Sequence, residues 1–374
     1  MGTHTSMNGL AEQDTFAPAR SQAHIPAATR THLPERNLDV LRAIAVLCVV
    51  TDHVMWACGV KPVILSDWEL GRIGVLLFFV HTSLVLMSSM ERGGMGSHWI
   101  RDFYVRRAFR IYPLAMAAVI ITVAFHIPTI VPAKFISPLP RTIVSNLLLV
   151  QNVSGDTNVV GMLWSLPIEM QMYLVLPVLY LIARRSVSGV LIAFGLAVIA
   201  GLTVQYVPAP GLWRLSLAVF GPCFVSGVLA FGILRRHWSA RLPAMLWIPV
   251  LLSVVPLFVL LNPSPERPAP GWLCCLAVGI AIPLVRELPA SLLTRVAKRI
   301  CTYSYGIYLL LTPAIWIGFV VFGREPRAIQ WLVLAIALVL LPWAAYKAIE
   351  HPAIAMGRDL VRSRQSPAIP APAP

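Results

Sequence analysis

The sequence predicts an all-α polytopic membrane protein with about ten transmembrane helices and both termini in the cytoplasm. Of its 374 residues, 57% are hydrophobic and only 12% are charged, and the mean hydropathy is +0.75. Soluble domains carry about 25% charged residues. The apolar residues gather in runs of about 20, the length that a helix needs to cross a hydrocarbon core of about 30 Å. Together these observations argue against a soluble domain folded around its own core.

Ten apolar runs are long enough to cross a membrane, and we predict one helix for each. In chain order they cover residues 38–58, 72–90, 111–131, 163–183, 187–206, 214–234, 243–261, 270–286, 302–322 and 328–347. An eleventh apolar piece, residues 142–153, is too short to cross comfortably and is expected to be re-entrant or interfacial. No stretch between the runs is long enough to form a separate soluble domain.

Polar segments flank the ten runs. Residues 1–37 lack the apolar stretch and cleavage site of a signal peptide, so we expect a disordered cytoplasmic tail. The membrane domain is expected to cover residues 38–350. Residues 351–374 end in the Pro-rich sequence RQSPAIPAPAP and are expected to form a second cytoplasmic tail.

The positive charges between the runs predict the orientation of the helices. With ten spans and both termini inside, only eight of the 30 Lys and Arg residues face the outside: Lys61, Arg72, Lys134, Arg141, Arg214, Arg267, Arg324 and Arg327. The remaining 22 lie on the inner side, which is the bias that cytoplasmic loops show. A crossing by residues 142–153 would invert every later helix, so the bias also argues against it.

The net charge of +14 does not indicate a nucleic-acid partner in a chain this apolar. Positive inner loops and attraction to anionic lipid headgroups explain it better, so the lipid bilayer is the expected partner. The six cysteines fall mostly within apolar runs and show no metal-ligand or disulfide spacing. We therefore expect no metal site.

Two polar residues share one face of the first predicted helix. Arg42 and His53 are eleven residues apart in LDVLRAIAVLCVVTDHVMWA, which is within about 20° of three full helical turns and about 16 Å along the axis. Ionisable residues inside a membrane segment usually mark a functional site. The neighbouring Asp52 should point about 100° away and is not expected to pair with His53.

Two further ionisable residues lie inside predicted spans. Glu169 is expected about 9 Å below the outer boundary, close to the depth of His53, so the two could converge on one cavity. There the carboxylate would orient the imidazole or bind acceptor hydroxyls, and a purely structural carboxylate is the alternative. His81, followed by Thr82 and Ser83, either extends the same polar cavity or makes a helix–helix hydrogen bond.

Arginines cluster at the inner end of the third predicted span. Arg107 and Arg110 are three residues apart and share a helical face. Guanidinium groups match phosphate oxygens in pairs, which favours binding of a phosphorylated ligand. The alternative is that these arginines only orient the helix and touch lipid phosphates.

Four segments in this order resemble the acyltransferase-3 family of integral membrane acyltransferases. The segments are LDVLRAIAVLCVVTDH, which resembles the family's Arg-x10-His helix, RRAFRIYP, WSLPIEMQMYLVLPVL, and SYGIYLL followed by AAYKAIEHP. The residues that match the family's motifs are Arg42, His53, Arg107, Arg110, Trp164, Ser165 and Glu169. The resemblance covers about residues 37–360.

The resemblance implies an enzyme that moves an acyl group, often acetyl, from cytoplasmic acyl-CoA to a hydroxyl of a sugar, a glycan or a macrolide-like molecule. By analogy, His53 would be the catalytic histidine. Arg42, Arg107 and Arg110 would hold acyl-CoA, a donor substrate such as acetyl-CoA, and no cofactor would be bound permanently. The cytoplasmic (inner) membrane is the expected location.

Substrate-binding residues are expected near the same motifs. Trp164 and Ser165 come from the matched motif before Glu169. His81 departs from the family pattern, since this chain reads FFVHTSLVL where relatives often read FFVLSGFL, and we expect this polar region to reflect acceptor choice. Leu311 stands where many relatives carry a histidine, so no role of that histidine is carried over.

These residues predict O-acyl transfer inside a membrane-embedded cavity. His53 would take the proton from an acceptor hydroxyl, whose oxygen would attack the thioester, and Glu169 would favour the imidazolium. Both direct transfer and an acyl-histidine intermediate fit the sequence. A proton-coupled exporter of a glycan or small molecule is the alternative, because ten spans with buried His and Glu fit that class too. The arginine cluster discriminates, since an exporter does not require it.

Overall fold

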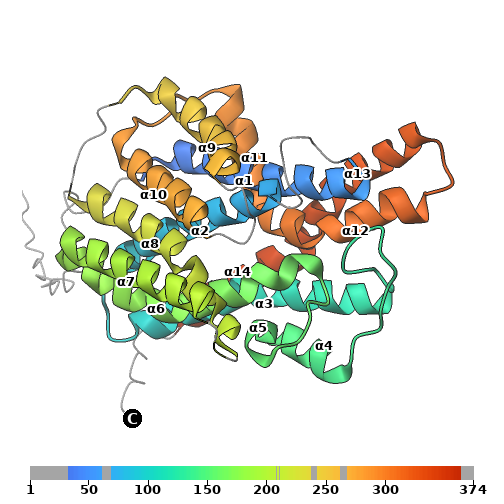
Figure 1. Ribbon diagram of the computed structural model, residues 1–374, viewed down its shortest axis with the longest axis horizontal. Helices are drawn as coiled ribbons and strands as arrows, with labels where there is room; N and C mark the ends of the chain where they lie inside the picture. Colours follow the sequence, from blue (N-terminus) through green and yellow to red (C-terminus); the bar gives the residue numbers. More distant parts are fainter. Residues whose placement is uncertain are drawn as a thin grey trace, which may run out of the picture. The chain divides into compact units, whose positions relative to one another are not determined.

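The computed structural model describes residues 33–60, 69–207, 209, 211–236, 242–261 and 268–363, which form helices and no strand (Figure 1). The long helices are α1 (Glu35–Ala57), α2 (Glu69–Gly93), α3 (Trp99–Ala124), α6 (Leu166–Arg185), α7 (Val187–Tyr206), α8 (Ser216–Arg235), α9 (Trp247–Leu261), α10 (Ala269–Leu284), α11 (Leu292–Leu309), α13 (Arg327–Ala345) and α14 (His351–Ser363). The shorter elements are α4 (Pro140–Leu147), α5 (Gln151–Ser154), η2 (Gly161–Ser165), η3 (Leu212–Arg214), η4 (Ala244–Leu246), α12 (Leu311–Trp316), η5 (Ile317–Val321) and η6 (Tyr346–Glu350).

The helices confirm the all-α membrane fold that the hydropathy predicts. Eight helical stretches are long and apolar enough to cross a membrane, and a bent pair, α11 with α12 and η5, would be a ninth. The 16-residue apolar helix α10 coincides with the remaining predicted run. In the eleventh apolar piece, α4 and α5 have 8 and 4 residues, which is too short to cross. The side of the membrane on which the termini lie stays a prediction.

The predicted run 302–322 is a broken helix. α11 begins already at Leu292, and a bend of 76° separates its end at Leu309 from α12. Pro313 follows the bend, and since proline has no backbone N–H, it cannot donate to the carbonyl of Leu309. The apolar run therefore located the span but not the break within it.

Two helices extend beyond their apolar runs toward the side predicted to be cytoplasmic. α3 begins at Trp99, twelve residues before the predicted span, so Arg107 and Arg110 lie within the helix instead of at its mouth. Beyond α13, the π-helical turn η6 and α14 continue the helix to Ser363, where the sequence suggested a tail. The start of α1 at Glu35 likewise falls within the expected tail of residues 1–37, of which residues 1–32 lie outside the described residues.

α2 lies at the centre of the packing, between α1 and α8. Glycines allow these close approaches, since a Cβ atom on Gly74 would stand 2.5 Å from the carbonyl oxygen of Ala45 in α1. On the other side, a Cβ atom on Gly227 of α8 would overlap the carbonyl oxygen of Val80 and the hydroxyl of Ser83 in α2. Small residues are how membrane helices bring their backbones together, so these contacts fix the helix that separates α1 from α8.

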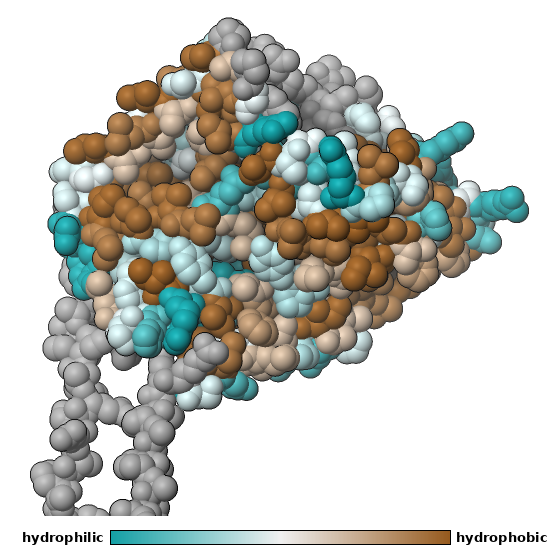
Figure 2. Space-filling view, turned by 90° about the horizontal axis from the view of Figure 1, so that it is seen from below, coloured by the Kyte–Doolittle hydropathy of each residue, from teal (hydrophilic) through white to brown (hydrophobic). Residues whose placement is uncertain are grey.

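Apolar side chains cover much of the molecular surface, as a lipid-facing protein requires. α7 is almost entirely apolar, yet only Val190 and Gly201 are buried in it. Ile192 and Leu196 on the same helix are 66% and 62% exposed. Figure 2 shows broad hydrophobic areas on the face seen from below. Soluble monomers rarely expose such continuous apolar surface, and the chain is a multi-pass membrane protein.

A compact ion cluster joins the ends of α2, α6 and α8 on the predicted cytoplasmic side. Glu91 of α2 accepts hydrogen bonds from the Tyr180 hydroxyl at 2.5 Å and from Arg235 Nε at 3.1 Å. Arg184 Nε of α6 lies 3.6 Å from the same carboxylate. One carboxylate thus ties three helices together.

Candidate functional site

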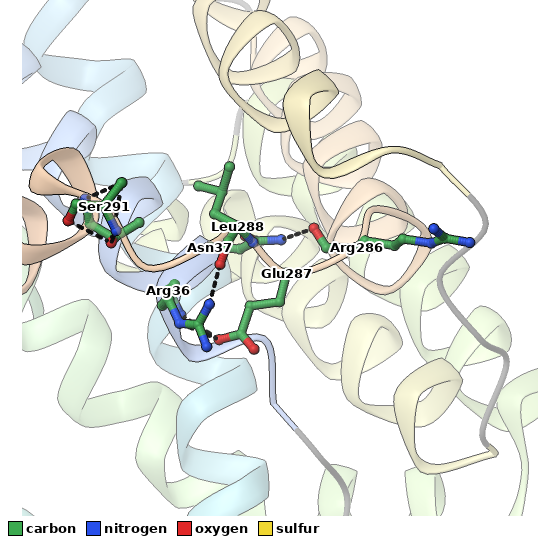
Figure 3. Close-up of polar contacts among 7 residues, drawn as sticks. Arg36, Asn37, Arg286, Glu287, Leu288 and Ser291 are labelled. Carbon is green, nitrogen blue, oxygen red and sulfur yellow. Dashed lines mark hydrogen bonds and ion pairs between the residues drawn. The ribbon is translucent and has the colours of Figure 1, made fainter.

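The start of α1 is held in place by the segment that connects α10 to α11 (Figure 3). Arg36 donates a hydrogen bond to the carbonyl of Leu288, and its own backbone N–H donates to Glu287 at 3.1 Å. The Asn37 side chain donates to the carbonyl of Arg286 at 3.1 Å and accepts from the backbone N–H of Leu288 at 2.9 Å. These contacts anchor the helix that carries both of the polar residues predicted to share a face.

His53 is oriented by its own helix. Its Nδ1 lies 2.9 Å from the carbonyl oxygen of Val49, one turn earlier. Only a protonated ring nitrogen can bond to a carbonyl, so this contact assigns the proton to Nδ1 and leaves the lone pair on Nε2. Asp52 Oδ2 lies 3.8 Å from the same Nδ1, which is beyond hydrogen-bond distance but close enough for an ion contact when the ring is protonated, although the two side chains were expected to point apart. The imidazole turns back along the helix, and this brings it within reach of its neighbour.

His53 opens into a cavity of about 380 Å³, called here the His53 cavity. Its walls come from α1, α2, the loop after α3, η2, α8 and the α11–α12 bend. The lining residues are Val49, Asp52, His53, Trp56, Gly71, Arg72, Val75, Thr129, Ile130, Val131, Gly161, Met162, Trp164, Phe220, Tyr308, Thr312 and Ile315. A mostly apolar cavity with a few polar groups is the usual form of a small-molecule site.

Arg42, Arg107 and Arg110 meet in a second cavity of about 110 Å³, called here the arginine cavity. The three predicted donor-binding residues thus come together from α1 and α3. The lining residues are Arg42, Val75, Phe78, Phe79, His81, Thr82, Val85, Leu86, Arg107, Arg110, Ile111, Ser165, Leu166, Glu169, Tyr173, Ser304, Tyr305 and Tyr308.

The three arginines differ in the partners available to them. Arg110 donates to the buried carboxylate of Glu350 at 2.8 Å. Glu169 accepts a hydrogen bond from the Tyr173 hydroxyl and lies within electrostatic range of all three arginines. By contrast, the Nε atoms of Arg42 and Arg107 are buried and have no hydrogen-bond partner among the described residues. Buried donors are normally satisfied, so these two guanidinium groups suit an anionic ligand.

The other predicted substrate-binding residues divide between the two cavities. His81 lies in the arginine cavity, 6% exposed, and its Nδ1 has no hydrogen-bond partner in the part of the chain that the structure describes. Ser165 lines the arginine cavity as well, whereas Trp164 lines the His53 cavity. The polar region around His81 therefore faces the arginines and not His53.

The two cavities meet at Tyr308 and Val75, the residues that line both of them. Tyr308 Oη shares a hydrogen bond with Ser165 Oγ at 2.8 Å. Arg42 and His53 both belong to the continuous helix α1, and each lines one of the two adjoining cavities.

The structure differs from the sequence prediction at Glu169. It also adds Asp52, Tyr308 and Glu350 to the site. Glu169 lines the arginine cavity, so the predicted convergence with His53 is not found. Asp52 lies beside the histidine instead. Glu350 and Tyr308 lie in segments that carry the family resemblance, AAYKAIEHP and SYGIYLL, but the sequence predicted no role for either residue. The signal for Glu350 was a carboxylate next to the last apolar run, but its pairing with Arg110, 240 residues away, depends on tertiary packing.

The sequence matches a family model described as an acyltransferase domain over residues 35–347. The chain belongs to the acyltransferase-3 family. The match begins at the first residue of α1 and ends within η6, so the family's domain contains every residue of both cavities.

Three curated relatives share this family's sequence features. The chain is 26% identical over 364 residues to the peptidoglycan O-acetyltransferase OatA of Listeria monocytogenes, covering 87% of this chain and 56% of the relative. It is 25% identical to Nodulation protein 10 of Rhizobium leguminosarum, covering 88% of this chain and 96% of the relative. It is 27% identical over 202 residues to the putative peptidoglycan O-acetyltransferase YrhL of Bacillus subtilis, covering 48% and 30%.

The chain therefore spans about half the length of the Listeria relative and nearly all of the Rhizobium relative. No solved structure matches the chain.

Proposed function

We propose that this chain is a membrane O-acyltransferase that moves an acetyl group from acetyl-CoA to a hydroxyl of a sugar or glycan. Membership of the acyltransferase-3 family supports acyl transfer. Two relatives are named as peptidoglycan O-acetyltransferases, which supports a glycan acceptor. The arrangement of α1 carries the proposal, because one helix face presents a cation to one cavity and a histidine to a second cavity that adjoins it.

The arginine cavity is the proposed donor site. Acyl-CoA carries several phosphate groups, and Arg42 and Arg107 each keep a buried Nε–H without an acceptor in the described chain. Charge-assisted bonds between guanidinium and phosphate are short and strong. The positive-inside bias supports a cytoplasmic opening of this cavity, where acyl-CoA would be available, and the proposed location is the cytoplasmic membrane.

The His53 cavity is the proposed acceptor site. Its volume of about 380 Å³ is suited to a small-molecule ligand, and Trp56 and Trp164 supply large flat surfaces on its walls. Asp52 and Thr312 add polar groups that can orient hydroxyls. A sugar of a glycan chain would enter this cavity with one hydroxyl directed at His53.

The proposed reaction is direct transfer with His53 as general base. Nε2 accepts the proton of the acceptor hydroxyl as the oxygen attacks the thioester carbonyl carbon. The resulting tetrahedral species collapses, the carbon–sulfur bond breaks, and the imidazolium returns the proton to the CoA thiolate. Nδ1 remains bonded to Val49 throughout, and Asp52 favours the cationic ring as it forms.

Glu169 is assigned to the donor side of this mechanism. Its carboxylate lies in the arginine cavity, bonded to Tyr173, and the positive charge around it comes from the three arginines. It would hold the guanidinium groups in position for the donor and would not touch the acceptor hydroxyl. This replaces the role beside His53 that its expected depth had suggested.

A proton-coupled exporter is the less favoured function. The sequence supports it through ten spans with buried His and Glu, and in the structure His53 and Glu169 line different cavities. The family match and the arginine cavity both favour the transferase.

The test of the proposal is a transfer assay on His53→Ala. Membranes that contain the protein are incubated with acetyl-CoA labelled in the acetyl group, and label is counted in glycan material. We expect the substitution to lower the rate by about 10²–10⁴-fold, the usual contribution of a general base. The matched control is His98→Ala, because His98 is exposed and lines neither cavity. A His53→Ala rate near wild type at equal membrane abundance would remove the histidine from the mechanism.

A further inference from the structure

The junction between the two cavities is built around one aromatic ring. Tyr308 is on the last turn of α11, and its hydroxyl shares a hydrogen bond with Ser165 at 2.8 Å. Phe78 of α2 packs against the ring edge to face, with centroids 6.2 Å apart. Ser165 lines the arginine cavity and its neighbour Trp164 lines the His53 cavity. The hydrogen bond therefore joins α11 to the segment that runs past both cavities.

The ring also sits immediately before the break in its helix. α11 ends at Leu309, one residue after Tyr308, and α12 leaves at 76°. Side chains near a helix break are not locked by a continuous backbone hydrogen-bond ladder on both sides, because Pro313 leaves one bond of the ladder unmade. Besides its burial in the core, the Tyr308 ring is held by its hydrogen bond to Ser165 and its edge-to-face contact with Phe78.

The proposed reaction requires a group to pass this ring. The donor's phosphates would be held by Arg42 and Arg107 in one cavity, whereas His53 lies in the other. The acyl end of acyl-CoA must therefore reach into the His53 cavity, so that its carbonyl carbon can meet the acceptor oxygen. The arginine cavity has about 110 Å³, less than a third of the other's 380 Å³, so a bulky acyl group would find little room before the ring.

We propose that Tyr308 is a gate between the donor and acceptor cavities and that its ring, tied to Ser165, determines which acyl groups can cross. The inference rests on the proposed transferase function and adds a specificity-determining residue to it. An acetyl group presents only a methyl to the opening, and an unbranched chain presents the same cross-section. An acyl group branched next to its carbonyl, such as isobutyryl, is wider and is excluded by the ring.

The experiment compares two donors in the same membranes. Wild-type protein is given acetyl-CoA or isobutyryl-CoA, each labelled in the acyl group, and the ratio of isobutyryl to acetyl transfer is measured. In Tyr308→Ala the ring is absent, and we expect the ratio to rise at least tenfold. In Tyr308→Phe the ring remains but the bond to Ser165 is lost, so we expect a smaller rise of about threefold.

The control variant removes a ring that lies outside both cavities. Tyr303→Ala removes a ring from the same helix, but Tyr303 packs against Tyr346 and lines neither cavity, so the ratio should stay at the wild-type value. An unchanged ratio in Tyr308→Phe and Tyr308→Ala would overturn the gate and leave the transferase intact. If Tyr308→Ala does not accumulate in membranes, the ratio in Tyr308→Phe decides. Wild-type membranes that transfer neither acyl group would overturn the proposed function, and the gate with it.

Discussion

Arg107 and Arg106 are neighbours in α3, yet their surroundings differ. Arg107 lines the arginine cavity and buries an Nε–H that has no acceptor among the described residues. Arg106 does not line the cavity. Leaving a buried donor unsatisfied costs about 1–3 kcal/mol, and a ligand that supplies the acceptor recovers that cost. The proposed donor would supply such an acceptor to Arg107.

We expect Arg107→Gln to raise the KM for acetyl-CoA at least tenfold. The substitution removes a charge-assisted contact to phosphate, which is about twice as strong as a neutral hydrogen bond. Arg106→Gln changes the net charge equally and should leave the KM within about threefold, since that side chain lies outside the cavity. Steady-state kinetics with varied acetyl-CoA measure both. Equal KM values for the two variants would return the cluster to a role in helix orientation alone.

At the residue scale, what could be predicted depended on whether one helix determines the geometry. Arg42 and His53 lie on the same helix, and fixed helical geometry was sufficient to place them on one face. Glu169 lies on another helix, and its depth did not reveal which way it faces relative to α1. The contact of Asp52 with His53 escaped prediction because backbone angles alone do not include the turn of the imidazole toward Val49.

Among the elements, α2 is the most constrained, because α1 and α8 both approach its backbone. The glycines at these contacts, Gly74 and Gly227, give no hydropathy signal, so the sequence predicted the helices but not which of them touch. The apolar runs likewise predicted the apolar parts of the helices but not the polar first turns of α3 and α11. These extensions pack on neighbouring helices, α3 on α14 and α11 on α1, and such contacts leave no mark in the hydropathy.

Gly227→Ala should destabilise the protein. A Cβ atom there would overlap the backbone of α2 at Val80, and overpacking typically costs about 1–3 kcal/mol. We expect a drop of several degrees in the thermal midpoint of the purified protein in detergent. Gly195→Ala is the matched control, because a Cβ atom on Gly195 of α7 would meet no other heavy atom within 4 Å. Equal midpoints for the two variants would show that the α2–α8 contact is not tight.

For the molecule as a whole, the distribution of positive charge predicts cytoplasmic termini. Reporter proteins fused after Pro374 test this directly. A fluorescent protein that matures only in the cytoplasm should give signal there, and alkaline phosphatase, which needs an oxidising compartment, should be inactive. The reverse pattern would place the C-terminus outside the cytoplasm and contradict the predicted orientation. A second fusion before α1 gives an independent reading of the number of spans, since an even number requires the same result at both ends.

The meeting of two cavities at Tyr308 has an electrical consequence. If water fills the arginine cavity from the cytoplasm and the His53 cavity from the outside, the transmembrane voltage falls mostly across the short distance between them at Tyr308. It then does not fall evenly across the full bilayer. Moving one elementary charge through such a field costs about 2.3 kcal/mol per 100 mV. An acetyl group is neutral and passes without electrical work, whereas a succinyl group would carry a carboxylate against or along the field. The energised cell would thus discriminate between acyl donors by charge.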